Sequence, residues 1–323
     1  MAPQGEAGRR LAVVGASGSL GTQLLELIEE RALPYRELAL YRAEPLGEDS
    51  VQVAGTHHRL QKLESGAELS DFDLVFLATP RAAAQQLAGD IAGPVVIDLS
   101  SHELPPAAAP LLAPGFVARE QVRTLAARKL VHVPHPVALA LATIWRALEQ
   151  PSFLSATALL SASVRGRDTV KDLVQQSADL LNGRLDLADS EVQFGFNASP
   201  FGTPALAGAL LAQTARLLGS PPALALHLVR IPILHGVGLA VTAPPDTDVR
   251  AWPQRLRAAA GVLLVEEEPA LSVIDAIGQE ALLVSLHPAA SGPGLWCVMD
   301  NARSAALTAL WIAECLSAAE PLH

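Results

Sequence analysis

Short apolar runs alternate with helical patterns over the first part of the chain. The run Leu11–Val14 is followed by a glycine-rich turn, and leucines then recur at the three- and four-residue spacing of an amphipathic helix. Further strand-like runs are Glu37–Tyr41, Phe72–Pro80, Pro94–Ser101 and Arg128–Pro134. Runs that are nearly all apolar are typical of parallel strands covered on both faces. The pattern predicts an open, doubly wound α/β domain up to about residue 135.

The second half of the chain carries more strand candidates and fewer helical patterns. The strand candidates are Phe153–Val164, His227–Pro244, Gly261–Pro269, Glu280–Pro288 and Gly294–Asp300. Two helical patterns, Asp168–Leu181 and Pro204–Leu218, separate the first of them, and Ala302–Glu320 predicts a closing helix. This order favours an α+β domain with a mixed or antiparallel sheet.

The turn after the first strand has the composition of a phosphate-binding turn. Glycine permits a tight turn and a close backbone approach, and the following helix offers free N–H groups to a pyrophosphate. Serine hydroxyls add donors or cap the helix. The predicted cofactor-binding residues are Gly15, Ser17, Gly18, Ser19, Leu20 and Gly21. Strand, turn and helix arrive in order, which favours dinucleotide binding over an ordinary glycine-rich turn.

The end of the second strand bears on the choice between NADP and NAD. Arg42 follows Tyr41 and favours NADP, because an arginine there accommodates the 2′-phosphate. Glu44 is close by and keeps NAD open, since an acidic residue binds the ribose hydroxyl. Both side chains are also compatible with solvated loop charges.

Composition narrows the class of protein. The 323 residues are 50% hydrophobic and 17% charged, enough for two domains with a large core or an extensive interface. A net charge of −10 without a basic cluster argues against nucleic acid as a partner. No apolar run has the length of a membrane span. Cys297 and Cys315 form neither a disulfide framework nor a metal site, and two isolated thiols fit a cytoplasmic protein.

Five segments together resemble a known family. They are "VVGASGSLG", "VVIDLSS", "VPHPVALALATIWRAL", "RIPILHGVG" and "GLWCVMDNARSAAL". Their order and spacing resemble those of aspartate-semialdehyde dehydrogenases over nearly the whole chain, and most of all the Usg-type paralogues. The resemblance implies a Rossmann-like dinucleotide-binding domain, residues 1–135 with 303–323, and a mixed-sheet dimerisation domain, residues 136–302. It also implies a homodimer built on the second domain's sheet.

In the family a cysteine attacks an aldehyde carbon, a histidine acts as acid/base, hydride passes to NADP, and phosphate releases the acyl group. Laid on this chain, the nucleophile position is Pro136, which has no nucleophilic atom. The acid/base position is Val237, and the candidate substitutes are His135 and His235. His235 would share a face with Val237 if the segment were one strand, although a buried or paired histidine is the simpler interpretation. Arg230 matches the substrate-binding arginine, and an ion pair or strand-edge charge is the alternative.

Other positions of the family pattern also differ. The phosphate-binding arginine is replaced within His102–Leu104, and the expected glutamine falls at Leu160 or Ser161. The acidic residue and lysine of the substrate helix are apolar here, which leaves Gln213 and Arg216 as its polar residues. In the family one segment approaches the nicotinamide, and this chain keeps three residues of its pattern, Asp300, Asn301 and Arg303. The lysine of the pattern is replaced by Ser304.

Three hypotheses follow from the sequence. The first is a non-catalytic, dimeric relative that still binds NADP or NAD. The second is an active oxidoreductase of altered mechanism, with Arg230 as a carboxylate anchor and His135 or His235 as acid/base. The third is a structural or partner-binding protein with an empty glycine turn. No metal site is predicted.

Overall fold

The structure is a computed structural model that describes residues 8–42, 49–100, 105–106, 109–184, 193–266, 270–287 and 292–317. The chain forms two compact units. Unit 1 consists of Met1–His135 with Ala305–His323, and unit 2 of Pro136–Ser304.

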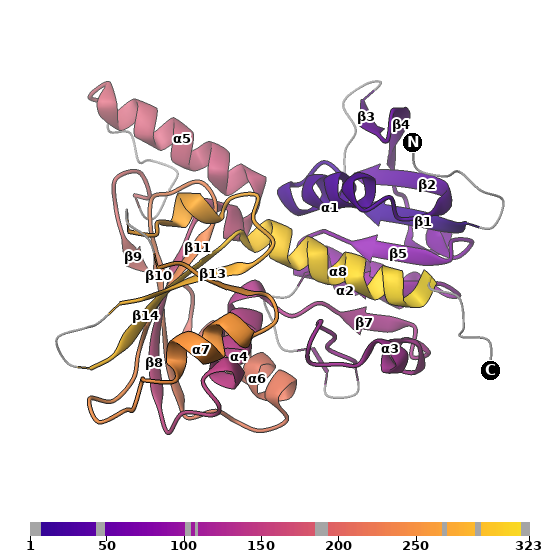
Figure 1. Cartoon of the computed structure of the whole chain (residues 1–323). Helices are drawn as coiled ribbons and strands as arrows, with labels where there is room; N and C mark the ends of the chain where they lie inside the picture. The colour runs from indigo at the N-terminus through magenta and orange to yellow at the C-terminus, as the bar shows by residue number, and fades with distance from the viewer. Residues whose placement is uncertain are drawn as a thin grey trace. The chain divides into compact units, whose positions relative to one another are not determined.

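Unit 1 is built on a seven-stranded sheet of order β3-β4-β2-β1-β5-β6-β7 (Figure 1). Every neighbouring pair is parallel except β3 with β4. The strands are β1 Arg9–Val14, β2 Tyr35–Arg42, β3 Ser50–Val53, β4 Thr56–Lys62, β5 Leu74–Leu77, β6 Val95–Asp98 and β7 Leu130–His132. The helices are α1 Ser19–Glu30, α2 Arg81–Asp90, α3 Arg119–Ala126 and, from Ala305 onward, α8 Asn301–Ser317, with a short 3-10 turn η1 Gly66–Leu69.

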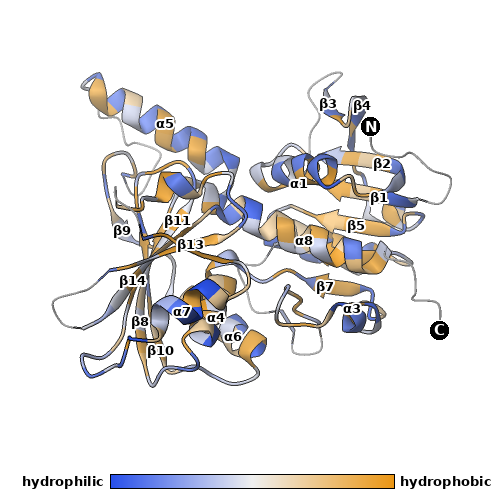
Figure 2. Ribbon diagram, in the orientation of Figure 1, coloured by the Kyte–Doolittle hydropathy of each residue, from blue (hydrophilic) through white to orange (hydrophobic). Residues whose placement is uncertain are grey.

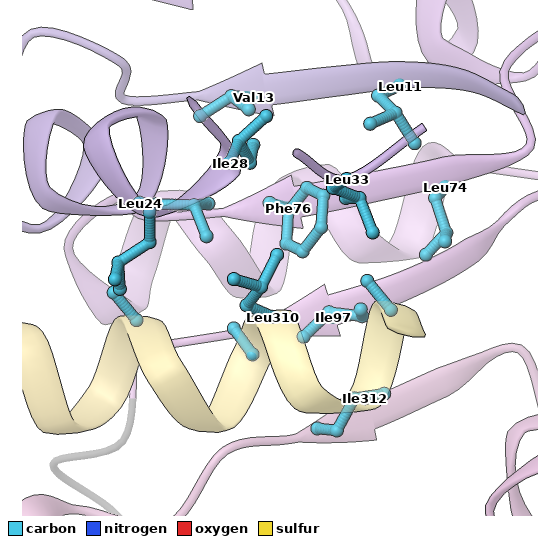
Figure 3. Packing of buried hydrophobic residues seen from close by; sticks show 14 of the residues in the cluster. Leu11, Val13, Leu24, Ile28, Leu33, Leu74, Phe76, Ile97, Leu310 and Ile312 are labelled. Atoms are coloured by element: carbon cyan, nitrogen blue, oxygen red, sulfur yellow. The ribbon is translucent and has the colours of Figure 1, made fainter. Parts of the chain in front are cut away.

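Both faces of this sheet are covered, as nearly continuous apolar strands require. On one face, Leu11 and Phe76 pack with Leu24 of α1 and Leu310 of α8 (Figure 3). Because side chains alternate along a strand, the neighbouring residues of β1 and β5 point to the opposite face, where Ala84 of α2 joins them. The prediction of a doubly wound α/β domain is confirmed.

Unit 2 is built on a second seven-stranded sheet, of order β12-β13-β14-β11-β8-β10-β9, which is mixed. Its strands are β8 Leu154–Leu160, β9 Ser199–Pro200, β10 Leu224–Arg230, β11 Val237–Thr242, β12 Val262–Leu264, β13 Leu282–Leu286 and β14 Gly294–Met299. Its helices are α4 Pro136–Ala147, α5 Arg167–Leu181, α6 Pro204–Leu218 and α7 Trp252–Ala258, with 3-10 turns η2 Ala162–Arg165 and η3 Val273–Ala276.

One face of the second sheet is a fully formed core. Ile144 of α4, Leu210 of α6 and Leu256 of α7 pack with Leu239 and Cys297 from the central strands. In Figure 2 much of β11 and β13 is coloured as hydrophobic, whereas α5 and α7 include hydrophilic residues as well. The other face carries half-exposed residues on its central strands, among them Thr157 and Leu159 of β8.

Candidate functional site

The strand order of unit 1 reverses direction at β1. Chain progression runs from β1 to β2 on one side and from β1 to β5 on the other. In doubly wound folds the crevice at such a point, outside the carboxyl ends of the strands, is where ligands bind. The predicted glycine turn lies at this point, because it directly follows β1 and precedes α1.

Backbone atoms lie so close to two glycines of the turn that neither position has room for a side chain. A Cβ on Gly15 would lie 2.4 Å from the carbonyl oxygen of Ala78, which follows β5. A Cβ on Gly21 would lie 2.2 Å from the carbonyl oxygen of Gly15. Gly15 also has φ +87°, a backbone conformation that favours glycine. Its N–H donates to the carbonyl oxygen of Tyr41 over 2.9 Å, which ties the turn to the end of β2.

The amino terminus of α1 is arranged for an anion. Gly18 is the N-cap residue, which offers no side chain to cap the helix, and the first turn has no acidic residue. Neither Ser17 nor Ser19 occupies the cap position, so of the two alternatives for these serines, hydroxyl donor or helix cap, the cap was wrong. The first backbone N–H groups of a helix lack intrahelical partners and lie at the positive end of its dipole. These features fit the pyrophosphate of a dinucleotide.

Arg42 lies at the end of β2, where adenosine ribose recognition is expected. Its Nη1 lies 2.6 Å from Oδ2 of Asp49 in an ion pair that is partly exposed. A 2′-phosphate would have to share this guanidinium with Asp49. Glu44, the acidic residue that is compatible with NAD as the cofactor, lies outside the described residues, as do His102, Glu103 and Leu104.

The elbow segment runs from β7 directly into α4. Val133, Pro134 and His135 connect the two elements, and Pro136 is the first residue of α4. Proline suits the first helical position, because its fixed φ matches the helix and its missing N–H would be unpaired there. His135 and Pro136 are both buried. Pro136 thus has a structural reason to begin this helix and contributes no reactive group.

The segment His227–Pro244 is two strands rather than one, which corrects the prediction for His235. β10 ends at Arg230, and β11 begins at Val237, which is completely buried. His235 lies in the loop between them and is exposed. The alternation rule that would have put His235 on the face of Val237 does not apply in a loop. Of the two simpler interpretations, a buried or a paired histidine, the buried one was wrong because His235 is exposed.

Arg230 is held by an aromatic ring and a hydroxyl group. Its guanidinium lies 4.4 Å from the ring centroid of Phe194, and Nη2 donates to Ser199 Oγ over 3.3 Å. No carboxylate of the described residues pairs with it, and its Nε is buried without a partner in this part of the chain. Burial, together with the charge of Arg165, lowers the pKa of Arg230. The ion-pair alternative for Arg230 was therefore wrong within the described residues. A bound anion would reduce the repulsion between the charges of Arg230 and Arg165.

The segment Asp300–Arg303 forms the beginning of α8. Asp300 Oδ1 accepts from the backbone N–H of Arg303 over 3.0 Å, as an N-cap side chain does. Its other carboxylate oxygen accepts from Gly278 N over 3.1 Å. Asn301 is buried, and its Oδ1 accepts from Ser163 Oγ over 3.1 Å. Asn301 therefore already has a hydrogen-bond partner inside unit 2.

Sequence reasoning missed a buried charged cluster at the carboxyl edge of the first sheet. Asp98 and His132 end adjacent strands and are register partners. His132 Nδ1 and Arg81 Nη1 lie 3.0 and 2.9 Å from Asp98 Oδ2, and Ser100 donates twice to Asp98 Oδ1. Burial raises the pKa of Asp98, but hydrogen bonds from His132 and Ser100 outweigh it and lower the pKa overall. The available sequence signal was a polar residue at the end of each of two apolar runs.

The two cysteines are free and buried, as core thiols. Burial raises the pKa of each thiol, which disfavours the nucleophilic thiolate. The described residues hold no group of side chains suited to a metal ion. Among the described helices, none combines the length and apolar character needed to cross a membrane.

These features define a Rossmann-like dinucleotide-binding domain joined to a mixed-sheet α+β unit. Residues 10–126 match the family model "Semialdehyde dehydrogenase, NAD binding domain". The chain is 31% identical to a USG-1 protein homolog of Azotobacter vinelandii, over 95% of this chain and 97% of that protein. It is 26% identical to an aspartate-semialdehyde dehydrogenase of Synechocystis, over 95% and 97% of the two chains.

Solved structures agree with this assignment. A probable aspartate-semialdehyde dehydrogenase from Pseudomonas aeruginosa matches with a TM-score of 0.82 and 31% identity, over 96% of this chain and 98% of that one. The aspartate semialdehyde dehydrogenase II of Vibrio cholerae shares the fold, with a TM-score of 0.82 at 24% identity over 96% and 98% of the two chains. The protein belongs to the aspartate-semialdehyde dehydrogenase family and is similar to the USG-1 homologues within it.

Proposed function

We propose that this protein is a dimeric dinucleotide-binding member of the family that does not carry out the thioester chemistry of a semialdehyde dehydrogenase. The observation that carries the proposal is the contrast between two parts of the chain. The glycine turn keeps a helix N-terminus with glycine at its cap, whereas the elbow offers Pro136 in place of a nucleophile. Val237, at the matching acid/base position, is apolar and buried.

NADP is the preferred nucleotide in this proposal. Arg42 is the cation at the end of β2, and its partner Asp49 is itself partly exposed, so a phosphate can replace or share the pairing. When bound, the dinucleotide would supply a hydride acceptor or donor. The chain's own part is to hold the pyrophosphate at the turn from Gly15 to Gly21.

Arg230 provides an anion-binding group in unit 2. Its guanidinium is partly desolvated, lies over Phe194 and lacks a carboxylate partner among the described residues. An arginine in this state fits a carboxylate or phosphate group. We therefore assign to Arg230 the binding of an acidic small molecule, without a covalent step at Pro136.

The test is a nucleotide titration followed by thermal shift, with NADP and NAD in parallel. We expect stabilisation by NADP that grows with its concentration, as binding linkage requires. In the same buffer, NADP, phosphate and aspartate semialdehyde should give no reduced cofactor. No shift at millimolar nucleotide would contradict dinucleotide binding, and turnover would contradict the loss of thioester chemistry.

The variant Pro136→Cys tests the loss of chemistry more sharply. Nucleophile, base and anion-binding groups act as a unit, so one restored thiol should not restore turnover. Treatment of the variant and the wild type with the same alkylating reagent shows whether the new thiol is accessible, because only an accessible Cys at position 136 adds a label that the wild type lacks. Turnover by Pro136→Cys would show that the remaining residues are still competent and that the proposal overstates the loss.

The homodimer is assigned to the half-exposed face of the second sheet. This face is opposite the one that packs with α4, α6 and α7, and its side chains are small or apolar in large part. It comprises Ser155, Thr157, Leu159, Ala225, His227, Val229, Ala240, Thr242 and Trp296. An apolar surface of this kind is suited to a subunit interface.

Light scattering after gel filtration tests the dimer. Ala240→Glu places a charge on the central strand β11, and burying it without a partner should shift the protein toward monomer. Ala258→Glu, at an exposed position of α7, is the matched control and should remain dimeric. A monomeric wild type, or two variants that behave alike, would refute this assignment.

A further inference from the structure

His132 has a buried ring nitrogen that makes no hydrogen bond to any of the described residues. The residue ends β7 and is 3% exposed. Its Nδ1 lies 3.0 Å from Oδ2 of Asp98, whereas its Nε2 is buried without a hydrogen-bond partner in the part of the chain that the structure describes. Such unpaired atoms are rare in native proteins, and each requires an explanation such as strain, an ordered water or ion, or a functional role.

Asp98 determines which ring nitrogen is free. Its two oxygens accept from His132, Arg81 and twice from Ser100, which uses the acceptor capacity of an ionised carboxylate. Because an ionised carboxylate only accepts, Nδ1 carries a ring hydrogen, and in the tautomer with its hydrogen on Nδ1 the other nitrogen, Nε2, offers a lone pair. Arg81 Nη1 also lies 2.9 Å from Asp98 Oδ2, so the carboxylate already has a cation as a partner. The ring is thus held in one orientation, with Nε2 left without a partner among the described residues.

The position of His132 along the sheet edge indicates what it faces. In this fold the pyrophosphate lies at the turn after β1, and the adenosine ribose lies toward the end of β2, where Arg42 is. The nicotinamide half therefore extends the other way, over the ends of β5, β6 and β7. Three strand spacings separate β1 from β7, roughly 14 Å. Thr79 Oγ1, beside the glycine turn at the end of β5, is a second buried polar atom without a partner among the described residues.

We propose that His132 Nε2 accepts a hydrogen bond from the nicotinamide nucleoside half of the bound dinucleotide. The donor is an N–H of the carboxamide or an O–H of the ribose, since both can donate a hydrogen bond to the lone pair of a ring nitrogen. Asp98 and Arg81 hold the ring in place. This inference rests on the proposed function, because it requires that the protein bind a dinucleotide.

Calorimetric titration with NADP and two fragments tests the proposal. The fragment 2′-phospho-ADP-ribose lacks the nicotinamide, and 2′,5′-ADP lacks the whole nicotinamide nucleoside. In His132→Phe, NADP should bind about tenfold more weakly, the effect of one lost hydrogen bond, while 2′,5′-ADP binds unchanged. His132→Gln keeps an amide acceptor and should recover most of the affinity.

The pattern of loss identifies the donor. Weakening of NADP alone indicates the carboxamide, and weakening of NADP and 2′-phospho-ADP-ribose together indicates the ribose hydroxyl. The control is His58→Phe, because His58 of β4 also has a buried Nε2 without a partner in the described part of the chain. It lies beyond β2, on the other side of β1, and should leave NADP affinity unchanged.

Nitrogen-15 NMR of the wild-type protein gives a second measurement that does not depend on folding of a variant. NADP should move the Nε2 resonance of His132, and 2′,5′-ADP should leave it in place. Equal weakening of all three ligands, no weakening of any, or an unmoved Nε2 resonance with NADP bound would overturn the inference. A wild-type protein that binds none of the three overturns the proposed function itself.

Discussion

Replacing Asp98 by asparagine removes the centre of the buried charged cluster while keeping its shape. The amide has only one acceptor oxygen where the carboxylate had two. If that oxygen faces Ser100, the NH2 group faces the donors of His132 and Arg81. If the amide is turned, Ser100 N faces the NH2 group. Either orientation leaves donors opposed to donors in a buried site, so Asp98→Asn should destabilise unit 1.

The magnitude follows from the burial of the three side chains. Those of Asp98 and His132 are each 4% exposed and that of Arg81 is 13% exposed. Removing one partner of a buried ion pair typically costs about 3–5 kcal/mol. The lower figure applies here, about 3 kcal/mol, because one acceptor survives and Arg81 retains some solvent contact. For a unit of this size class each kcal/mol lowers Tm by ~2–4 °C, which gives a decrease of roughly 6–12 °C.

The stability lost in Asp98→Asn should decrease as the pH falls. The pKa of Asp98 is lower in the folded chain than its ordinary value of 3.8. A lowered folded pKa contributes stability that is present above the ordinary value and is lost as pH falls through the folded pKa. The Tm difference between wild type and Asp98→Asn should therefore be full at pH 7 and shrink once the pH falls below about 4.

Thermal unfolding from pH 7 downward, followed by circular dichroism, measures both effects. The control is Asp90→Asn, because Asp90 ends α2, where an acidic group is unfavourable to the helix dipole, and is exposed. It should leave Tm almost unchanged. An Asp98→Asn protein within 2 °C of wild type at neutral pH, or a difference that persists undiminished in acid, would refute the account of the cluster.

Further predictions concern the glycine turn, the nucleotide and the thiols. Gly21→Ala should lower Tm and abolish stabilisation by NADP, because its Cβ would meet the Gly15 carbonyl oxygen at 2.2 Å; Gly89→Ala, with open space around it, is the control and should keep both. Gly18→Ala should leave Tm nearly unchanged and weaken NADP binding; equal effects on Tm and binding would contradict this. Arg42→Ala should weaken NADP about tenfold and leave NAD unchanged, as measured by calorimetry, and equal loss for both nucleotides would contradict a 2′-phosphate contact. Cys297 and Cys315 should react with a thiol reagent only on unfolding, because burial raises the pKa of both thiols, and rapid labelling of the native protein would contradict their burial.

The fold of unit 1 could be predicted because its signals are local. The apolar runs of β1 and β5, the glycine turn and the helical spacing of α1 each lie within a few consecutive residues. Likewise α6 spans Pro204–Leu218, the range predicted from its periodicity, because proline opens it and Gly219 with φ +77° ends it.

The site was less predictable, because it depends on turns and on strand pairing. His235 was placed in a strand although Pro232 and Gly236 bracket it, and Gly236 adopts φ +86° in the loop that separates β10 from β11. The cluster of Asp98 and His132 depends on the register between two strands about 30 residues apart. No local sequence pattern predicts which residues pair between strands so far apart in the chain. Only the structure brings a carboxylate and an imidazole together at the sheet edge.

Retained glycines do not by themselves show that a nucleotide is bound, because packing can require them in an empty site. Gly21 would be needed in either case, since its Cβ has no room beside the Gly15 carbonyl oxygen. Gly18 differs, because its Cβ would meet only the Gly15 oxygen, at 3.3 Å, and its φ of −75° suits any residue. At Gly18 the packing of the turn would have to shift by only a few tenths of an ångström to admit a Cβ, whereas a phosphate approaching the N-terminus of α1 would exclude one. The effect of Gly18→Ala therefore separates a turn kept for its packing from a turn kept for its ligand.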